Sequence, residues 1–139
     1  MIEADALECP LGASSVDMIF CTFGLKTFSE TQLSSLAAEV TRMLRPGGTF
    51  AFLEISVPPN PLLRIPFLFY LQQVVPLLGR LFLGNPENYR MLGVYTRAFH
   101  NCQTTGSLFA KAGLQIHFRS YFFGCATGFV GCKPLPSQS

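Results

Sequence analysis

Two stretches of the chain are apolar at almost every position and have the length of a strand. The first covers residues 16–23 and the second covers residues 49–55, and neither alternates between apolar and polar side chains. Such continuous runs are typical of strands buried on both faces, as in a parallel sheet. Between them, apolar residues recur at helical spacing over 30–44, behind a Ser29–Gln32 capping box. The pattern predicts a βαβ unit with a right-handed crossover, whose helix ends at an Arg-Pro-Gly-Gly turn.

The segment 57–83 differs from the rest because it is dense in Leu, Phe and Val and contains five prolines. Arg64 and Arg80, together with two glutamines, interrupt it. No uninterrupted apolar run therefore approaches the roughly 20 residues that a membrane span needs. We expect this segment to be an apolar cover over a pocket, or a surface that touches lipid.

The rest of the chain predicts two helices followed by two strands. The helices are expected around 88–98 and 104–112, the second ending at Gly113, because glycine commonly follows the last turn of a helix. Strands at 114–123 and 126–132 are expected to form an antiparallel hairpin at the sheet edge. The chain then divides into a βαβ core over 1–56, a helical cover over 57–103, a helix with the hairpin over 104–133, and a tail over 134–139.

Composition narrows the class of protein. The length of 139 residues suits one domain, and a net charge of +2 argues against a broad nucleic-acid surface. The hydrophobic fraction of 49% and the 14 Phe residues exclude a disordered tail. Five cysteines without a C-x-x-C spacing favour reduced thiols, and hence the cytoplasm or the mitochondrial matrix. No signal peptide is recognised at the start of the sequence.

Most familiar catalytic arrangements lack support in the residues. His100 and His117 stand apart from other strong ligands, so no metal site is expected. No G-x-S-x-G elbow places a serine nucleophile. Cys21 and Cys132 lie in apolar strands, where a buried and inert thiol is expected. The double glycine follows a helix, which indicates a turn and not a phosphate-binding loop.

Charged residues near the predicted strand ends are more informative. Open α/β sheets bind ligands beyond the carboxyl ends of their strands. By that rule we expect Asp5 and Ala6 to lie at the same sheet edge as the segment 22–26 and to face the same crevice. The alternative for Asp5 is that its carboxylate only caps or stabilises a loop. Asp17 lies at the opposite end of its strand and is expected to be structural. Lys26 is a cation in an apolar neighbourhood, for which simple solvation is the alternative.

Several short motifs occur together in the order and spacing of a known family. They are Asp5-Ala6, Cys9-Pro10-Leu11, Ser15-Val16-Asp17, Phe23-Gly24-Leu25-Lys26, Leu44-Arg45-Pro46-Gly47-Gly48-Thr49, Leu53-Glu54-Ile55-Ser56-Val57-Pro58, Pro76-Leu77-Leu78-Gly79 and Ala112-Gly113-Leu114. Over nearly the whole chain they resemble the UbiE/COQ5 family of ubiquinone/menaquinone biosynthesis C-methyltransferases. The R-P-G-G turn is shared by many class I methyltransferases, whereas the F-G-L-K block with P-L-L-G is much more specific.

The resemblance implies an α/β fold, the doubly wound, Rossmann-like class I methyltransferase fold. It also implies transfer of a methyl group from S-adenosylmethionine to a ring carbon of a polyprenylated quinol. Asp5 and Ala6 match positions that contact the adenine end of this cofactor, and Thr22 matches a further cofactor-binding position. Lys26 and Thr27 match an arginine and an asparagine beside the reacting ring, where the pair is thought to help remove a proton through water.

The sequence departs from the family pattern at several of these positions. Lys26 keeps the charge of arginine but loses its planar fork of donors, and Thr27 lacks the amide. Tyr95, Thr96 and His100 replace Ser, Ile and Pro in a substrate-contacting segment. These departures leave the expected fold unchanged and weaken the expectation of a quinone substrate.

The family's glycine-rich loop and its ribose-binding acidic residue have no counterpart in the sequence. We therefore expect this chain to form the C-terminal part of the fold, with the N-terminal strands missing, and to be inactive alone. We also expect the strand at 16–23 to expose apolar faces and an open edge. One rival is a non-catalytic fragment or interaction module that self-associates or pairs with a fuller subunit. Another is a class I methyltransferase relative acting on a different lipid. The expected partners are a lipophilic quinol-type substrate and a peripheral membrane surface, and no nucleic acid.

Overall fold

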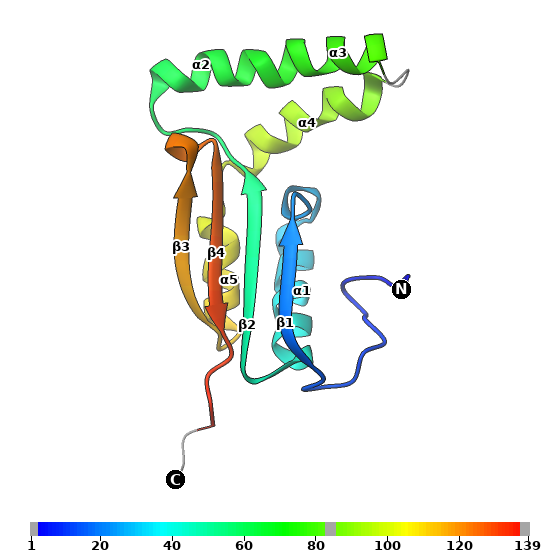
Figure 1. The fold of residues 1–139 in the computed structure, drawn as a ribbon, viewed down its shortest axis with the longest axis vertical. Helices are drawn as coiled ribbons and strands as arrows, with labels where there is room; N and C mark the ends of the chain where they lie inside the picture. Colours follow the sequence, from blue (N-terminus) through cyan, green and yellow to red (C-terminus); the bar gives the residue numbers. More distant parts are fainter. Residues whose placement is uncertain (1–2, 83–85, 137–139) are drawn as a thin grey trace.

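A four-stranded mixed sheet organises the molecule (Figure 1). The structure, a computed structural model, describes residues 3–82 and 86–136. The strand order is β1-β2-β4-β3, in which β1 and β2 are parallel and β4 is antiparallel to both of its neighbours. The predicted parallel pair and the predicted hairpin are thus both confirmed, with β3 at the sheet edge. The strands are β1 (Val16–Thr22), β2 (Leu44–Ile55), β3 (Gln115–Tyr121) and β4 (Ala126–Cys132).

The helix between β1 and β2 begins at the predicted capping box. In α1 (Glu30–Met43), the Ser29 hydroxyl accepts a hydrogen bond from the Gln32 backbone N–H at 3.3 Å, and the Ser29 N–H donates to the Gln32 side chain at 2.9 Å. Near the start of β2, where its pairing with β1 shifts in register, Gly47 has a φ of +80° that carries little steric cost only for glycine. The predicted apolar stripe of α1 is buried against the sheet and consists of Leu33, Leu36, Ala37, Val40 and Met43.

The proline-rich segment is helical from Pro61 to Phe82, and this part forms an arm, residues 61–82, across the carboxyl ends of β1 and β2 (Figure 1). Pro66 lies inside the first part of the arm, and Pro76 follows a π-helical turn. Because proline clashes with the carbonyl four residues before it, this wider turn lets the helix continue. The helical elements of this half are α2 (Pro61–Phe69), η2 (Tyr70–Val74), α3 (Val75–Phe82), α4 (Pro86–Phe99) and α5 (Gln103–Lys111).

The arm also has the length and composition of a membrane span. The residues Pro61–Leu81 form a 21-residue helix that is long and apolar enough, by length and composition alone, to cross a membrane. Arg64 and Arg80 interrupt its apolar sequence, as expected, but they do not end the helix. Only 11% of its most apolar window is buried within the protein.

An aromatic core lies on the face of the sheet that α1 and α5 cover (Figure 1). Phe50 and Phe52 of β2 meet Phe129 of β4 and Phe109 of α5, and all four side chains are buried. The Phe109 ring centroid lies 5.0 Å from those of both Phe52 and Phe129, in edge-to-face arrangements that suit the quadrupoles of the rings. This cluster fixes the hairpin and α5 against the central strand.

The opposite face of the sheet is open at β1. Met18 is 71% exposed and Phe20 is 69% exposed, because no described helix covers them. The outer edge of β1 also pairs with no strand in the described ranges. The prediction of a strand buried on both faces is therefore wrong for 16–23, whereas the expected exposed apolar face and open edge are confirmed.

Candidate functional site

A short turn carries the chain away from the carboxyl end of β1 and positions the first candidate residues. Phe23 adopts a left-handed backbone with φ of +61°, and Gly24 begins the 3-10 turn η1 (Leu25–Thr27). The Leu25 side chain is fully buried and anchors the turn in the core. As a result, the Lys26 side chain is directed toward the neighbouring strand β2.

Lys26 forms a buried ion pair with Glu54 of β2. The Lys26 Nζ lies 2.7 Å from Glu54 Oε1, and the two side chains are 6% and 0% exposed. The same ammonium group donates to the carbonyl oxygen of Phe23 at 2.9 Å. Simple solvation of Lys26, the alternative left open by the sequence, is therefore excluded.

The Glu54 carboxylate receives further hydrogen bonds from the backbone. The Ile55 N–H donates to Oε1 at 2.9 Å and the Lys26 N–H donates to Oε2 at 3.2 Å. An isolated carboxylate at this depth would be costly, whereas one with three donors is compensated. The pair thus fixes a compact polar centre at the carboxyl ends of the two parallel strands, where open α/β sheets bind their ligands.

Glu54 is the functional candidate that sequence reasoning missed. The Leu53-Glu54-Ile55-Ser56 motif indicates the family but does not by itself assign a role to its acidic residue. The available signal was physical, since a single carboxylate in an otherwise apolar strand requires a buried partner. That partner, Lys26, lies 28 positions away in the sequence, so it became identifiable only in the fold.

A second polar cluster joins β2, β4 and the start of α5. The Ser56 and Thr127 hydroxyls share a hydrogen bond, and the Thr127 hydroxyl also accepts from the Cys102 N–H at 3.0 Å. Burial raises the pKa of the Cys102 thiol to about 11, against the lowering effect of its hydrogen bond to Thr127. Burial first, and the Glu54 charge second, also raise the pKa of Cys21. Both cysteines remain protonated near neutral pH, which agrees with the expected inert thiol for Cys21.

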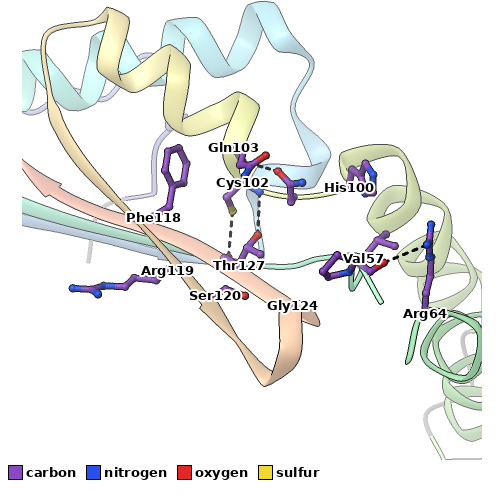
Figure 2. Close-up of a pocket in the computed structure, with 12 residues that line it drawn as sticks. Val57, Arg64, His100, Cys102, Gln103, Phe118, Arg119, Ser120, Gly124 and Thr127 are labelled. Carbon is purple, nitrogen blue, oxygen red and sulfur yellow. Dashed lines mark hydrogen bonds between the residues drawn. The ribbon is translucent and has the colours of Figure 1, made fainter. Parts of the chain in front are cut away.

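Two hollows flank these clusters. The larger, about 510 Å³, lies between the start of α5, the β3–β4 hairpin and the start of the arm (Figure 2). Cys102 and Thr127 occupy its middle, Arg64 and His100 lie at one end and Phe118 at the other (Figure 2). The smaller, about 240 Å³, is bordered by η1, α4 and α5, and it gives access to one side of the Lys26 centre.

The other predicted site residues take no part in the hydrogen bonds of this centre. Thr27 is exposed, and its hydroxyl donates to the Gly24 carbonyl at 2.7 Å, which closes the turn. Thr22 is exposed at the end of β1. Asp5 and Ala6 are exposed on the N-terminal coil, and the Asp5 carboxylate accepts from the Leu7 N–H at 2.8 Å, as the cap alternative anticipated.

These positions do not by themselves form a cradle for a nucleoside cofactor. Asp5, Ala6 and Thr22 line neither of the two hollows found in the described structure. Three exposed positions supply no enclosed surface for an adenine or a ribose. Within residues 3–82 and 86–136, no group of three or more potential metal ligands is found either.

Comparison with known proteins decides the family. The profile of the ubiE/COQ5 methyltransferase family matches residues 1–133. The chain belongs to this family. It is 33% identical over 132 residues to the demethylmenaquinone methyltransferase of Lactiplantibacillus plantarum, a match that covers 94% of this chain and 55% of that protein. For the demethylmenaquinone methyltransferase of Thermus thermophilus, the identity is 32% over 133 residues, or 96% of this chain and 60% of that protein.

A solved structure supports the fold independently. An S-adenosylmethionine-dependent methyltransferase of Methanosarcina mazei superposes with a TM-score of 0.55 at 15% identity, covering 96% of this chain and 66% of that chain. The four-stranded sheet is thus part of a Rossmann-like methyltransferase fold. The chain spans little more than half the length of the two curated relatives.

Proposed function

We propose that this ubiE/COQ5-family chain forms the substrate-binding part of an S-adenosylmethionine-dependent C-methyltransferase that acts on a polyprenylated quinol. The observation that carries the proposal is the buried Lys26–Glu54 pair, which lies at the carboxyl ends of β1 and β2. The apolar arm crosses the same end of the sheet (Figure 1). A polar centre at the end of the sheet that an apolar arm crosses suits a ring with hydroxyl groups and a hydrocarbon tail.

The chemistry of the pair suggests an electrostatic role for Lys26. An ammonium group held by a carboxylate and a carbonyl is a donor and cannot accept a proton. Its charge would favour an anionic oxygen on a quinol ring, and a quinolate has a more nucleophilic ring carbon. Glu54 acts through Lys26 and is therefore a positioning residue, while the ring proton would leave to water.

We also propose that the chain does not perform the reaction alone, because its cofactor positions lie exposed on a coil and at a strand end. Titration calorimetry of the purified chain with S-adenosylmethionine tests this part. No heat of binding is expected at micromolar to millimolar cofactor. Micromolar affinity would show that the chain forms a complete cofactor site.

A chimeric enzyme tests the role of the pair. Residues 1–133 would replace the matching segment of the Thermus thermophilus relative, which supplies the remaining length. Lys26→Met should lower kcat for a prenylated hydroquinone at least about tenfold while leaving the affinity for S-adenosylmethionine unchanged. Lys26→Arg should restore the rate. Unchanged kcat in Lys26→Met would contradict the electrostatic role.

The open face of β1 favours a second candidate, a non-catalytic module that pairs with a fuller subunit or with itself. Met18 and Phe20 present apolar surface beside an unpaired strand edge, which is a template for association. Light scattering after size-exclusion chromatography distinguishes the candidates. Two results together would favour the module. The chain would form a stable dimer that Phe20→Lys abolishes, and the chimera would show no methyl transfer.

Two finer expectations remain part of the proposal. The alternative of another lipid substrate would be supported by a chimera that methylates a different lipid but not a prenylated hydroquinone. A reducing compartment, the cytoplasm or the mitochondrial matrix, suits the five cysteines, none of which is in a disulfide.

A further inference from the structure

The outer side of the arm is an unusually large exposed apolar surface. Its most exposed side chains are aliphatic or aromatic, at 81% for Leu62, 73% for Ile65 and 62% for Phe69. The pattern continues after the π-turn with Leu77 at 65% and Leu81 at 73%. Soluble proteins rarely leave such a continuous row uncovered, so this face has a function in binding.

The inner side of the arm fixes its orientation relative to the rest of the protein. Leu68 and Leu71 are buried, and Gly79 is buried on the same helix. The arm packs along α4, and its axis crosses the ends of the strands (Figure 1). Because η2 and α3 pack against α4, the arm can lie flat in an interface, but it cannot cross a bilayer without leaving α4.

An aromatic tip adjoins the start of the arm. Phe122 and Phe123 are 80% and 85% exposed at the turn between β3 and β4. Both have left-handed backbones, with φ of +48° and +56°, which are unfavourable for aromatic residues. The tip is joined to the segment before the arm, where the Ser56 N–H donates to the Cys125 carbonyl at 2.9 Å. A strained turn that displays two phenylalanines to solvent is a sign of a binding role.

The distribution of charge identifies the surface that these apolar groups would meet. Residues 55–139 contain seven basic residues and one acidic residue, for a formal charge of +6, whereas residues 1–54 contain three basic and seven acidic residues, for −4. The arm carries Arg64 and Arg80, and no acidic residue lies between Glu54 and Glu87. Exposed apolar groups on an arm whose only charged residues are Arg64 and Arg80 are complementary to an anionic lipid surface.

We propose that the outer side of the arm and the aromatic tip together form an interfacial binding surface for an anionic lipid bilayer. We call it the lipid platform and define it by its most exposed apolar residues. The arm lies in the headgroup region, the tip inserts beside it, and the arginines contact lipid phosphates. The platform does not depend on the proposed catalytic role, because membrane binding is measured without turnover. The residues of the lipid platform are Leu62, Ile65, Phe69, Leu77, Leu81, Phe122 and Phe123.

Vesicle flotation with the full 139-residue chain tests the platform. The chain should float with vesicles of phosphatidylcholine and phosphatidylglycerol at a ratio of three to one, and bind pure phosphatidylcholine vesicles more weakly. The double variant Phe122→Ser/Phe123→Ser should lower the partition coefficient roughly tenfold or more. Arg80→Glu should weaken binding only to the anionic vesicles.

Two matched controls distinguish binding through the lipid platform from nonspecific adsorption to vesicles. Met18→Ser removes an equally exposed apolar side chain from β1, and Lys111→Glu reverses a charge at the far end of α5, so both should bind like the wild type. Circular dichroism and unfolding midpoints verify that each variant is folded. Washing with alkaline carbonate should release the wild-type chain from the vesicles.

Three results would overturn the proposal. In the first, the wild-type chain stays in the aqueous fraction with both vesicle types. In the second, Met18→Ser and the double phenylalanine variant lose binding equally. In the third, carbonate fails to release the wild-type chain, which would show that the arm spans the bilayer. A wild-type chain that dimerises and then ignores vesicles would assign the apolar surface to a second copy of this chain.

Discussion

The two faces of the sheet have similar amino acids and opposite environments. On the covered face, Phe52, Phe109 and Phe129 contact one another and are at most 3% exposed. On the other, Met18 and Phe20 are exposed by more than two thirds. The difference lies in what is packed against them, since α1 and α5 cover only one side. Apolar side chains on the covered face stabilise this chain, whereas those on the open face are available to bind something else.

The largest expected contrast is between a core and an open-face phenylalanine. Phe129→Ala should lower the free energy of unfolding by about 3–5 kcal/mol, because it leaves a cavity among four rings. Phe20→Ala should change it by less than about 1 kcal/mol, because the side chain is already largely in water. Urea unfolding of both variants measures the difference. Similar losses in the two would indicate that the open face is covered in solution.

The ion pairs offer a second contrast between buried and exposed groups. Glu54→Gln should destabilise the protein by about 2–3 kcal/mol, because Lys26 would remain buried without a counter-charge. Glu39→Gln, in the surface pair with Arg42 at 2.8 Å, should cost no more than about 0.5 kcal/mol. Equal effects in denaturant unfolding would mean that the Lys26–Glu54 pair is accessible to water.

The buried thiol of Cys102 makes a prediction about pH. Its pKa is raised from 9.0 to about 11 in the folded protein, so the folded state holds the proton more tightly than the unfolded chain. The associated stability is fully present below pH 9 and is lost as the pH rises toward 11, by about 2–3 kcal/mol. Unfolding measured from pH 8 to pH 11 should show a smaller loss in Cys102→Ala than in the wild type. Parallel profiles would contradict the raised pKa.

A smaller gain is expected at Thr96 of α4. Its hydroxyl is fully buried and lacks a hydrogen-bond partner among the described residues. Thr96→Val keeps the shape and removes the unsatisfied group, and should therefore stabilise the protein by about 1 kcal/mol. Thr105→Val, at a buried threonine of α5 without such a deficit, serves as the control. Thermal unfolding compares the two variants, and a loss of stability in Thr96→Val would show that the hydroxyl has a partner.

Local features of the fold were predictable from the sequence alone. The capping box at Ser29 and the apolar stripe of α1 both depend on residues a few positions apart. The hairpin is likewise formed by neighbouring segments. The family motifs added the class of fold, which matching over residues 1–133 then confirmed.

Features that depend on distant segments were not predictable in this way. The exposure of Phe20 depends on which helices cover a face, and continuous apolar runs look alike whether one face or both are buried. The Lys26–Glu54 pair joins two motifs that were recognised separately. Within the predicted helical cover, the π-helical turn that precedes Pro76 is a conformational adjustment that residue spacing does not reveal.

The central claim is that this chain shapes the quinol side of a C-methyltransferase. Mass spectrometry of the lipid product made by the Thermus thermophilus chimera tests it most directly. We expect a prenylated hydroquinone that gains one methyl group on a ring carbon, with product formation strongly reduced by Lys26→Met and restored by Lys26→Arg. A folded chimera that binds S-adenosylmethionine but yields only an O-methylated lipid, or no methylated lipid, would contradict it.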